Sequence, residues 1–378
     1  MSNLVVLRED APGERRVALV PSDVARLASL GVHVEVDAGA GEGAAHTDHE
    51  YREAGAEVAD PGRVLSGRRL VVGIGPPTAK VVDRLVPESI LLSFLPPATH
   101  LDVIARLRER GATALSFDLV PRISRAQSVD ALSSQASAAG YQAAVLAADR
   151  LGRMMPMLMT AAGTISPARV LVLGAGVAGL QAIATSRRLG AAVSAYDIRP
   201  EAAEEIRSLG ARFVELPIEA SEGSGGYAAE QTQEFVERQR ELVASTVAES
   251  DVVITTAAVP GRPAPKLVTA EMIERMRPGS IVIDLAAASG GNCELTRDRE
   301  EVIRSGVTII GASDLPSHVA TSSSALYSRN VVNAAQLLLA DGEWVVDTAD
   351  EVVGAMCCVA DGAVLHEPTR IALEGGRF

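Results

Sequence analysis

The chain has 378 residues, of which 47% are hydrophobic and 22% charged. This length predicts two domains at roughly 100–200 residues each, and the apolar content excludes a disordered chain. Only 3% of the residues are aromatic. The cores are therefore expected to consist of Ala, Val, Leu and Ile, and aromatic platforms that stack single-stranded nucleic acid are mostly unavailable.

The charge and the cysteine content narrow the class further. The formal net charge of −13 repels nucleic acid and anionic lipid unless a local basic patch intervenes. Three cysteines are too few for a disulfide framework, and no Cys or His spacing predicts a metal site, so a reducing cytoplasm is expected. No stretch reaches the ~18 uninterrupted apolar residues of a membrane span, and the N-terminal apolar run is too short for a signal peptide.

The first third of the chain alternates short apolar runs with helical patterns. Ser22 is in position to cap the first helix, which Gly31 would end. This alternation predicts an α/β domain with a mostly parallel sheet. The expected strands are 4–7, 32–36, 70–74, 90–95 and 112–117, and the expected helices are 23–30, 48–54 and 101–110.

Residues 129–155 lack proline and are rich in Ala, Leu and Gln. This composition predicts one long helix that connects two domains. A group of methionines between Met154 and Met159 follows. We expect them to pack in a core near the domain junction rather than against a cofactor.

The rest of the chain repeats the α/β pattern. Strands are expected at 169–173, 192–196, 212–215, 252–256, 281–285 and 307–310. A helix at 325–340 would return toward the first domain, and the tail at 351–364 is expected to form short strands. The sequence therefore predicts two Rossmann-like α/β domains with mostly parallel sheets that flank a cleft and are joined by long helices. The first domain would comprise 1–137 with 321–378, and the second 138–320.

A glycine-rich turn, Gly174-Ala-Gly176-Val-Ala-Gly179, stands between an apolar strand and a helical run at 180–189. This context is typical of the dinucleotide-binding G-x-G-x-x-G turn. Gly174 would permit the tight turn, Gly176 would let the backbone approach a pyrophosphate, and Gly179 would let helix and strand pack closely. The amides at the helix N-terminus would then face the phosphates.

Asp197 follows this turn at close to the roughly 20 residues expected for a ribose-binding acid. Such an acid accepts hydrogen bonds from the ribose hydroxyls and repels a 2′-phosphate, which favours NAD over NADP. Arg199 is a complication, because it would accommodate that phosphate or lie as a solvated side chain over the adenine. The loops at 257–261 and 286–292 would face the cofactor, and Gly290-Gly291-Asn292 fits either close approach to a ligand or a structural turn.

Residues 121–135 are unusually polar for a connection between a strand and an apolar-faced helix. Ser128 or Asp130 suits the cap of the following helix. Capping does not account for two arginines, a glutamine and several serines together, whereas a binding loop does. The segment is Pro-Arg-Ile-Ser-Arg-Ala-Gln-Ser-Val-Asp-Ala-Leu-Ser-Ser-Gln.

This segment resembles the signature loop of the NAD(H)-binding domain of proton-translocating NAD(P) transhydrogenases, a section of their alpha subunit that is related to alanine dehydrogenase. The resemblance covers nearly the whole chain. In that family this piece is either the front of a longer subunit or a separate soluble subunit, and the present chain resembles the latter. The further matching segments are 13–21, 159–164, 172–189, 225–228, 255–267 and 284–292.

The resemblance implies a set of site residues that all touch bound nucleotide. The nicotinamide-side contacts would be Arg122, Gln127, Asp130 and Ser133, of which the first three would be catalytic. The adenosine ribose would lie at Asp197, Ile198 and Arg199, and the pyrophosphate turn at Val177. Gly226 and Tyr227 would belong to a mobile loop, in which Gln231 stands where a Met is expected, and Gln239 and Ala258 would line the cofactor.

The implied reaction is direct hydride transfer between NADH bound here and NADP⁺ held on a partner domain, coupled to proton translocation by a membrane subunit. No general acid or base is required, because a hydride carries both electrons. Gln127 would hold the nicotinamide ribose side toward the partner, and Arg122 and Asp130 would orient each other and the carboxamide. The resemblance also implies a cytoplasmic homodimer, attached peripherally to the inner (plasma) membrane through membrane-embedded proton-conducting and NADP(H)-binding subunits.

Two other functions stay open at this point. An alanine-dehydrogenase-like oxidoreductase would use Arg16 for its substrate, but Gly73-Ile-Gly75 stands where that family's pattern has lysine, and Phe94-Leu-Pro96-Pro97 where it has histidine. A regulatory subunit would sense NAD(H) without turnover. Arg15 and Arg16 are equally well explained as a solvated pair near a turn.

Overall fold

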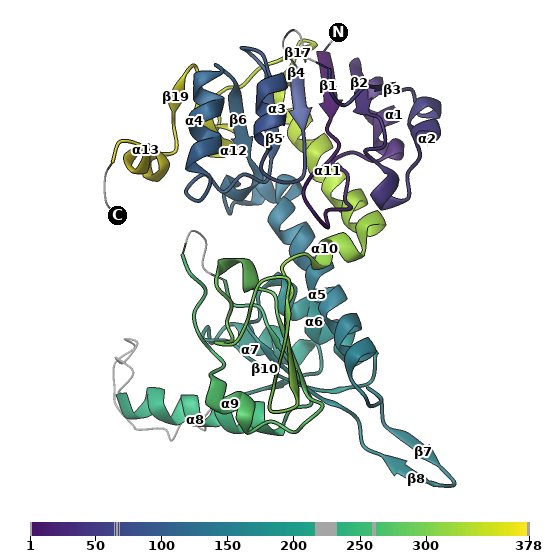
Figure 1. The fold of residues 1–378 in the computed structure, drawn as a ribbon, viewed down its shortest axis with the longest axis vertical. Coiled ribbons are helices and arrows are strands. Elements are labelled where there is room, and N and C mark those ends of the chain that lie inside the picture. The colour runs from purple at the N-terminus through teal and green to yellow at the C-terminus, as the bar shows by residue number, and fades with distance from the viewer. Residues whose placement is uncertain are drawn as a thin grey trace. The chain divides into compact units, whose positions relative to one another are not determined.

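The computed structural model describes residues 2–63, 65, 67, 69–215, 233–258 and 262–375, with the backbone alone over 233–239. The chain forms two compact units, one comprising Met1–Gln135 with Pro316–Phe378 and the other Ala136–Leu315 (Figure 1). These bounds differ by a few residues from the division proposed at 137/138 and 320/321. Within the described ranges, no helix combines the length and apolar character needed to cross a bilayer.

The first unit is built on an eight-stranded sheet in the order β3-β2-β1-β4-β5-β6-β18-β19. The strands from β3 to β6 are parallel, and β18 and β19 add an antiparallel edge. The order 3-2-1-4-5-6 is that of a doubly wound sheet. The strands are β1 (Ser2–Val6), β2 (Val32–Asp37), β3 (Glu57–Ala59), β4 (Arg69–Val72), β5 (Ile90–Ser93), β6 (Thr113–Ser116), β18 (Cys357–Ala360) and β19 (Ala363–Val364).

Helices cover both faces of this sheet, because its strands present apolar side chains alternately to two buried clusters (Figure 1). Val6 and Val72 belong to one cluster, and Val5 and Val71 to the other. The remaining elements of the unit are α1 (Pro21–Ser29), α2 (Asp48–Glu53), α3 (Ala79–Arg84), α4 (Leu101–Glu109), α10 (Leu315–His318), α11 (Ala320–Leu338), α12 (Glu351–Met356), α13 (Glu367–Leu373), the 3₁₀ turns η1 (Glu42–Ala44), η2 (Phe117–Leu119) and η3 (Ser124–Val129), and the small hairpin of β16 (Leu339–Ala340) and β17 (Glu343–Trp344).

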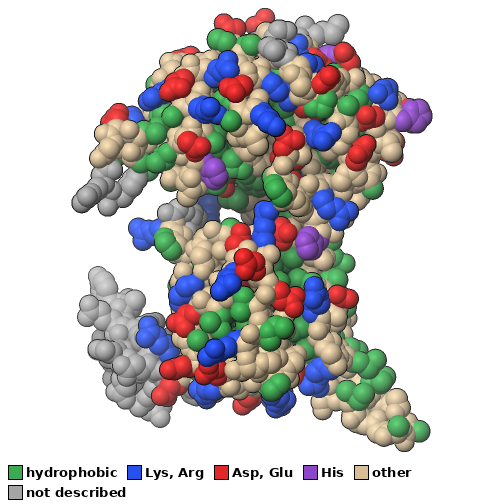
Figure 2. Space-filling model, viewed as in Figure 1, with side chains coloured by type: hydrophobic (Ala, Val, Ile, Leu, Met, Phe, Trp, Pro, Cys, Tyr) green, Lys and Arg blue, Asp and Glu red, His purple; other side chains and the backbone are tan. Residues whose placement is uncertain are grey.

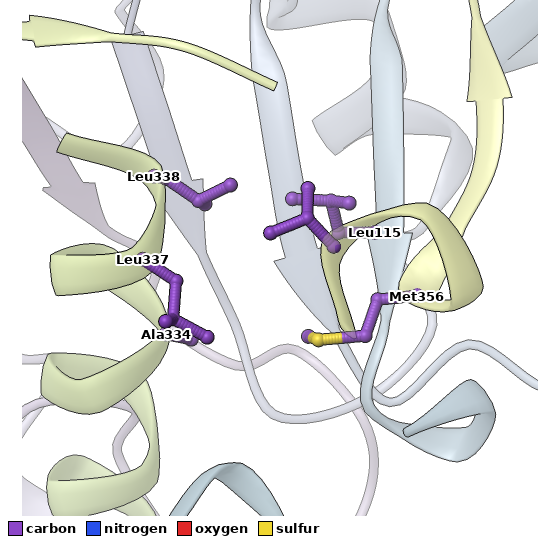
Figure 3. A pocket seen from close by; sticks show the side chains of 6 residues that line it. Leu115, Ala334, Leu337, Leu338 and Met356 are labelled. Atoms are coloured by element: carbon purple, nitrogen blue, oxygen red, sulfur yellow. The ribbon is translucent and has the colours of Figure 1, made fainter. Parts of the chain in front are cut away.

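Helix α11 packs one long buried face against the sheet. Tyr327 is fully buried, and its ring centroid lies 5.4 Å from that of Phe94 and 5.3 Å from that of Phe117. Farther along the helix, Leu338 and Leu115 of β6 line the same small apolar gap (Figure 3). This packing fixes α11 in the unit, so polar side chains on its other positions are rigidly presented.

Two helices of this unit begin earlier than predicted. Helix α1 begins at Pro21, whose ring presets a helical φ at the first position, so Ser22 lies inside the helix and the cap predicted for it is wrong. Helix α11 begins at Ala320 instead of residue 325. The serines of its first turns are compatible with a helix because they find partners, as where Ser324 Oγ accepts a hydrogen bond from the Val17 N–H at 3.0 Å.

The tail at 351–364 contains a helix where only strands were predicted. Residues 351–356 form α12 because the Asp350 carboxylate accepts hydrogen bonds from the N–H groups of Val352 and Val353 at 2.9 and 3.0 Å. The strands β18 and β19 follow, as predicted.

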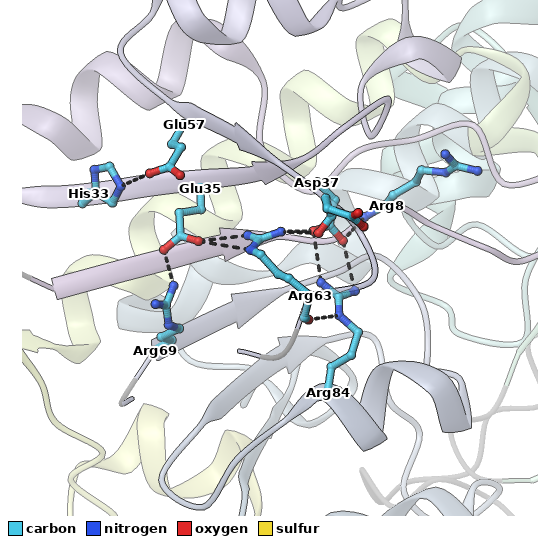
Figure 4. Close-up of polar contacts among 9 residues, drawn as sticks. Arg8, His33, Glu35, Asp37, Glu57, Arg63, Arg69 and Arg84 are labelled. Atoms are coloured by element: carbon cyan, nitrogen blue, oxygen red, sulfur yellow. Dashed lines mark hydrogen bonds and ion pairs between the residues drawn. The ribbon is translucent and has the colours of Figure 1, made fainter. Parts of the chain in front are cut away.

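An ion-pair network ties the loop before β4 and the end of α3 to β2 (Figure 4). The fully buried Asp37 carboxylate pairs with Arg63 at 2.8 Å and with Arg84 at 3.1 Å. Glu35 pairs with Arg63 at 3.0 Å and with Arg69. Burial raises the pKa of Glu35, but hydrogen bonds from the two arginines lower that pKa below its usual value. The buried carboxylates are tolerated because each one is bonded to two guanidinium groups.

The second unit has a seven-stranded sheet in the order β11-β10-β9-β12-β13-β15-β14, in which β14 is antiparallel to β15. Val170 and Val172 face one apolar cluster, and Leu171 and Leu173 the other. The prediction of two Rossmann-like α/β units with mostly parallel sheets is confirmed. The elements are β9 (Arg169–Leu173), β10 (Ala192–Tyr196), β11 (Arg212–Phe213), β12 (Val252–Thr255), β13 (Ile281–Asp284), β14 (Glu301–Arg304), β15 (Val307–Gly311), α6 (Val177–Arg188), α7 (Ala202–Ser208), α8 (Gln233–Glu249), α9 (Ala270–Glu274) and η4 (Ala287–Ser289).

The single helix expected at 129–155 is shorter, and a hairpin follows it. Helix α5 (Ala131–Arg150) ends before Gly152, and β7 (Leu158–Thr160) pairs antiparallel with β8 (Gly163–Ile165). The hairpin extends away from the body of its unit (Figure 1), and hydrophobic side chains gather on it (Figure 2).

The predicted core packing of the four methionines is wrong for three of them. Met154, Met157 and Met159 are 49%, 57% and 72% exposed, and only Met155 is buried. The reason is the hairpin: a two-stranded ribbon that projects into solvent has no second layer to cover its side chains.

Candidate nucleotide-binding site

The turn after β9 has the geometry that a dinucleotide-binding turn requires. Gly174 has a φ of +100°, and a Cβ there would lie 2.7 Å from Thr256 Oγ1. A Cβ on Gly179 would lie 1.9 Å from the Gly174 carbonyl oxygen, a separation that only glycine permits. A Cβ on Gly176 would meet nothing within 4 Å. The space beside the N-terminus of α6 is therefore open to a ligand, and the N–H groups of its first turn suit a phosphate.

The end of β12 supports this turn from the side. Thr256 donates its Oγ1 hydrogen to the Gly174 carbonyl at 3.0 Å. Asn292 is fully buried; it accepts from the Ala257 N–H at 3.0 Å and donates to the Ala257 carbonyl at 2.8 Å. A Cβ on Gly291 would lie 2.7 Å from a buried carboxylate oxygen. The 290–292 segment is thus a structural turn, and sequence reasoning missed the role of Asn292 in holding it to β12.

Asp197 lies directly after β10 and beside the glycine-rich turn. Its Oδ2 accepts from the Ala175 N–H at 2.7 Å, and its Oδ1 accepts from the Arg199 N–H at 2.8 Å. The Arg199 guanidinium folds back onto the same carboxylate, with Nε 3.0 Å from Oδ1 and Nη2 3.1 Å from Oδ2. Burial raises the pKa of Asp197, but these hydrogen bonds lower that pKa below its usual value. Asp197 is therefore an ionised acceptor whose counter-ion is Arg199.

Three further predicted contacts of this unit have exposed apolar side chains. Val177 is the first residue of α6 and is 43% exposed, and Ile198 follows Asp197 and is 78% exposed. Ala258 is exposed beyond the end of β12. Since no side chain of the unit covers them, all three are free to contact a ligand.

The polar segment predicted as a binding loop belongs to the first unit. Arg122 and Gln127 are exposed, and neither makes a hydrogen bond or ion pair with another described residue. Asp130 instead caps α5, because its carboxylate accepts from the Ser133 N–H at 2.9 Å and from Ser133 Oγ at 2.6 Å. The expected pairing of Arg122 with Asp130 is therefore wrong: the cap uses the carboxylate.

The predicted site residues thus fall into two sets. One set lies in the 136–315 unit around the turn after β9, and the other lies between η2 and the first turn of α5. Gly226, Tyr227 and Gln231 lie outside the described residues, as does the side chain of Gln239. Among the residues that the structure does describe, no group of three or more His, Cys, Asp or Glu side chains can hold a metal ion.

A polar pocket of about 220 Å³ in the first unit is lined by Arg16 and Glu14. Arg16 donates to Glu14 through Nε at 2.8 Å and Nη2 at 2.6 Å, and to Gln135 through Nη1 at 2.8 Å. Ser317 also donates to Glu14, at 2.6 Å. A substrate carboxylate would have to displace Glu14 from Arg16. The interpretation as a solvated pair is therefore wrong for Arg16, whereas Arg15 is exposed.

Glu9 is a buried acid in the wall of this pocket. Its Oε1 accepts from the Ile74 N–H at 2.6 Å, and burial raises its pKa from 4.5 to about 7. Because the folded-state pKa lies above the unfolded one, the stability contributed by protonated Glu9 is complete below the unfolded value and is lost as the pH rises through about 7.

We expect Glu9→Gln to raise the melting temperature relative to the parent by an amount that grows from about pH 5 to about pH 8, because glutamine cannot ionise. Thermal unfolding across this range measures the effect. Glu42→Gln, at an exposed position of the same pocket, is the matched control and should give a constant difference. A constant difference for Glu9→Gln as well would show that Glu9 does not titrate in this range.

Two doubly wound units, one of them with an open glycine-rich turn and an ionised acid beside it, define a Rossmann-type oxidoreductase of the NAD-binding class. The family model described as "Alanine dehydrogenase/PNT, N-terminal domain" matches residues 5–139, and "Alanine dehydrogenase/PNT, C-terminal domain" matches residues 143–367. The chain belongs to this family.

Its relatives place the chain in the transhydrogenase branch of the family. It is 43% identical over 374 residues to the first of the chains that make up the NAD(P) transhydrogenase alpha subunit of Rhodospirillum rubrum, with 96% of this chain and 97% of that protein covered. The crystal structure of transhydrogenase from Sinorhizobium meliloti matches with a TM-score of 0.88 and 40% identity, over 96% of this chain and 100% of that one. Alanine dehydrogenase of Bacillus subtilis is 29% identical over 342 residues, covering 88% of this chain and 84% of that protein. The resemblance found in the sequence is confirmed.

Proposed function

We propose that the 136–315 unit binds NAD(H) and that hydride passes directly between this nucleotide and NADP(H) held on a partner subunit. The transhydrogenase relatives support the reaction class. The observation that carries the proposal is the open space at Gly176 beside the N-terminus of α6, with ionised Asp197 next to it. The helix N-terminus suits a pyrophosphate, and the carboxylate suits the hydroxyls of a ribose.

The same pair of side chains supports NAD(H) rather than NADP(H) in this unit. An ionised Asp197 repels a 2′-phosphate. Arg199 is the residue that would attract such a phosphate, but its guanidinium is bonded to Asp197 and the pair is neutral overall. A phosphate here would meet no net positive charge from this pair.

The loop of the first unit is proposed to act on the nicotinamide end by position. When bound, the nicotinamide ring supplies the carbon that gives or takes the hydride. The reacting carbons must approach to about 3–3.5 Å in an aligned geometry. Arg122 and Gln127 have free donors and an acceptor for this task, and Asp130 and Ser133 brace the start of α5 beside them. No proton is moved, so no group of the loop has to act as an acid or base.

The proposed partners are a membrane-embedded proton-conducting subunit and an NADP(H)-binding subunit. They would attach this chain peripherally to the cytoplasmic face of the inner (plasma) membrane. The names of the relatives support this proposal, since an alpha subunit implies other subunits.

We further propose a homodimer, which the β7–β8 hairpin supports. Met157, Leu158, Met159 and Ile165 are all exposed on this projecting ribbon. Apolar side chains that gather on a protruding element are usually covered by another chain.

Replacing Met159 and Ile165 together by Asp is expected to convert the dimer to a monomer, because two charges would be buried in the contact. Sedimentation velocity measures the mass, and NADH binding should persist. Ile303→Asp, at an exposed position of β14 in the same unit, is the control and should stay dimeric. A dimer that survives the double change would show that the hairpin does not make the contact.

Mixing with the partner subunits tests the proposed reaction. The chain alone is expected to bind NADH without reducing an NADP⁺ analogue, and the NADP(H)-binding subunit should restore the reduction. Continued silence of a mixture that binds NADH would favour the NAD(H)-sensing subunit instead. Production of NADH from L-alanine by the chain alone would favour an amino-acid oxidoreductase.

A further inference from the structure

The segment that carries Gln127 is held to α11 by two asparagine side chains. Asn330 and Asn333 each donate an Nδ2 hydrogen to the Ser128 carbonyl oxygen, both at 3.0 Å. One carbonyl oxygen has two lone pairs and can accept both bonds. Because Ser128 follows Gln127 directly, the two amides fix the peptide next to that side chain.

Asn330 makes a second contact with the same segment. Its Oδ1 accepts a hydrogen bond from Ser134 Oγ at 2.8 Å. The side chain is buried, so water does not replace these bonds easily. Ser128 and Ser134 lie on either side of Asp130 and Ser133. A single buried amide therefore spans the section of the loop that holds two of the proposed nicotinamide-side residues.

The backing of this contact is rigid. Val331 and Val332, the neighbours of Asn330 on α11, are fully buried in the core cluster that also holds Ala126 and Val129 of η3. The loop is thus anchored by apolar side chains on both sides of the exposed Gln127. Between these anchors, the asparagine amides are the contacts from α11 that set the orientation of the Ser128 peptide.

We propose that Asn330 is a positioning residue for hydride transfer and that it acts through Gln127. This inference rests on the proposed function. The rate of transfer depends on alignment at the reacting carbons, so a loop that loses its tether slows the reaction. NADH affinity depends mainly on the glycine-rich turn and on Asp197, which Asn330 does not contact. The inference therefore predicts a loss in rate without a loss in binding.

The full chain with Asn330→Ala, mixed with the partner subunits, is expected to transfer hydride about tenfold more slowly at saturating nucleotide, with an NADH dissociation constant within about twofold of the parent. Asn333→Ala removes one donor and leaves the Ser134 contact, so a smaller loss is expected. Gln336→Ala is the matched control, because this exposed amide on the same helix makes no hydrogen bond with a described residue. Its rate should equal that of the parent.

A double-mutant cycle with Gln127→Asn separates positioning from general damage. If Asn330 acts through Gln127, the double variant is expected to be no slower than Gln127→Asn alone. Losses that multiply, or a weakening of NADH binding equal to the loss in rate, would overturn the inference. Should Asn330→Ala fail to fold, the same cycle with the less buried Asn333→Ala decides. Parental rates in the asparagine variants refute only the positioning role, whereas a parent mixture without transfer refutes the proposed function.

Discussion

Gln127→Asn is expected to slow hydride transfer by about a hundredfold while NADH affinity changes by less than about twofold. The change shortens the side chain by one methylene and keeps the neutral amide, so it moves the hydrogen-bonding group without altering charge. Gln127 is exposed and has no partner among the described residues, so its shortening leaves the loop in place. Stopped-flow kinetics of the mixed subunits measures transfer, and calorimetry measures binding.

Ser124→Ala is the control for this experiment. Ser124 is exposed in the same 3₁₀ turn and makes no hydrogen bond with a described residue, so the variant should behave as the parent. If Gln127→Asn destroys NADH affinity and bound NADH still reacts at the parental rate, Gln127 serves binding and not position.

Asp197→Ala is expected to weaken NADH binding by about tenfold to a hundredfold and to abolish most of the preference over NADPH. Two effects combine. The ribose hydroxyls lose a charged acceptor, and Arg199 loses the carboxylate that now holds its guanidinium. A freed guanidinium is a good partner for a 2′-phosphate. Calorimetric titration with both nucleotides measures the two dissociation constants.

Arg199 provides the controls for this second experiment. Arg199→Ala keeps the acid and should keep the preference for NADH. The double change at Asp197 and Arg199 removes both groups and should lose the gain in NADPH affinity. Unchanged NADH affinity in Asp197→Ala would mean that this carboxylate does not bind the ribose.

The features of the fold that depend on local pattern are predictable from the sequence. Strands β9 and β10 lie where they were predicted, because buried parallel strands are continuous apolar runs bounded by glycine. Gly174 and Gly179 follow from the same local logic, since a left-handed φ and a close helix contact admit no side chain.

Features that depend on distant partners or on competing local signals are not predictable in this way. Asn292 and Asn330 read as ordinary polar residues, because their partners Ala257 and Ser128 lie far away in the sequence. The run at 351–360 is apolar throughout, so periodicity does not separate its helix from its strand. Only the Asp350 cap marks the helix.

The candidate site shows the same division. The sequence offered Asp130 both as a cap and as a binding residue, and the structure shows the cap. The Asp197–Arg199 pair was not foreseen, because either side chain alone is a reasonable nucleotide contact. Their mutual bonding, visible only in three dimensions, changes the charge that a nucleotide meets.

The most direct test of the central proposal uses NADH that carries deuterium at the C4 hydrogen that is transferred. This nucleotide is mixed in ordinary water with the chain, the NADP(H)-binding subunit and an NADP⁺ analogue. We expect the reduced analogue to carry the deuterium, and only when both proteins are present. A reduced analogue that carries hydrogen from the solvent, or no reduction by a chain that demonstrably holds NADH, would contradict direct transfer.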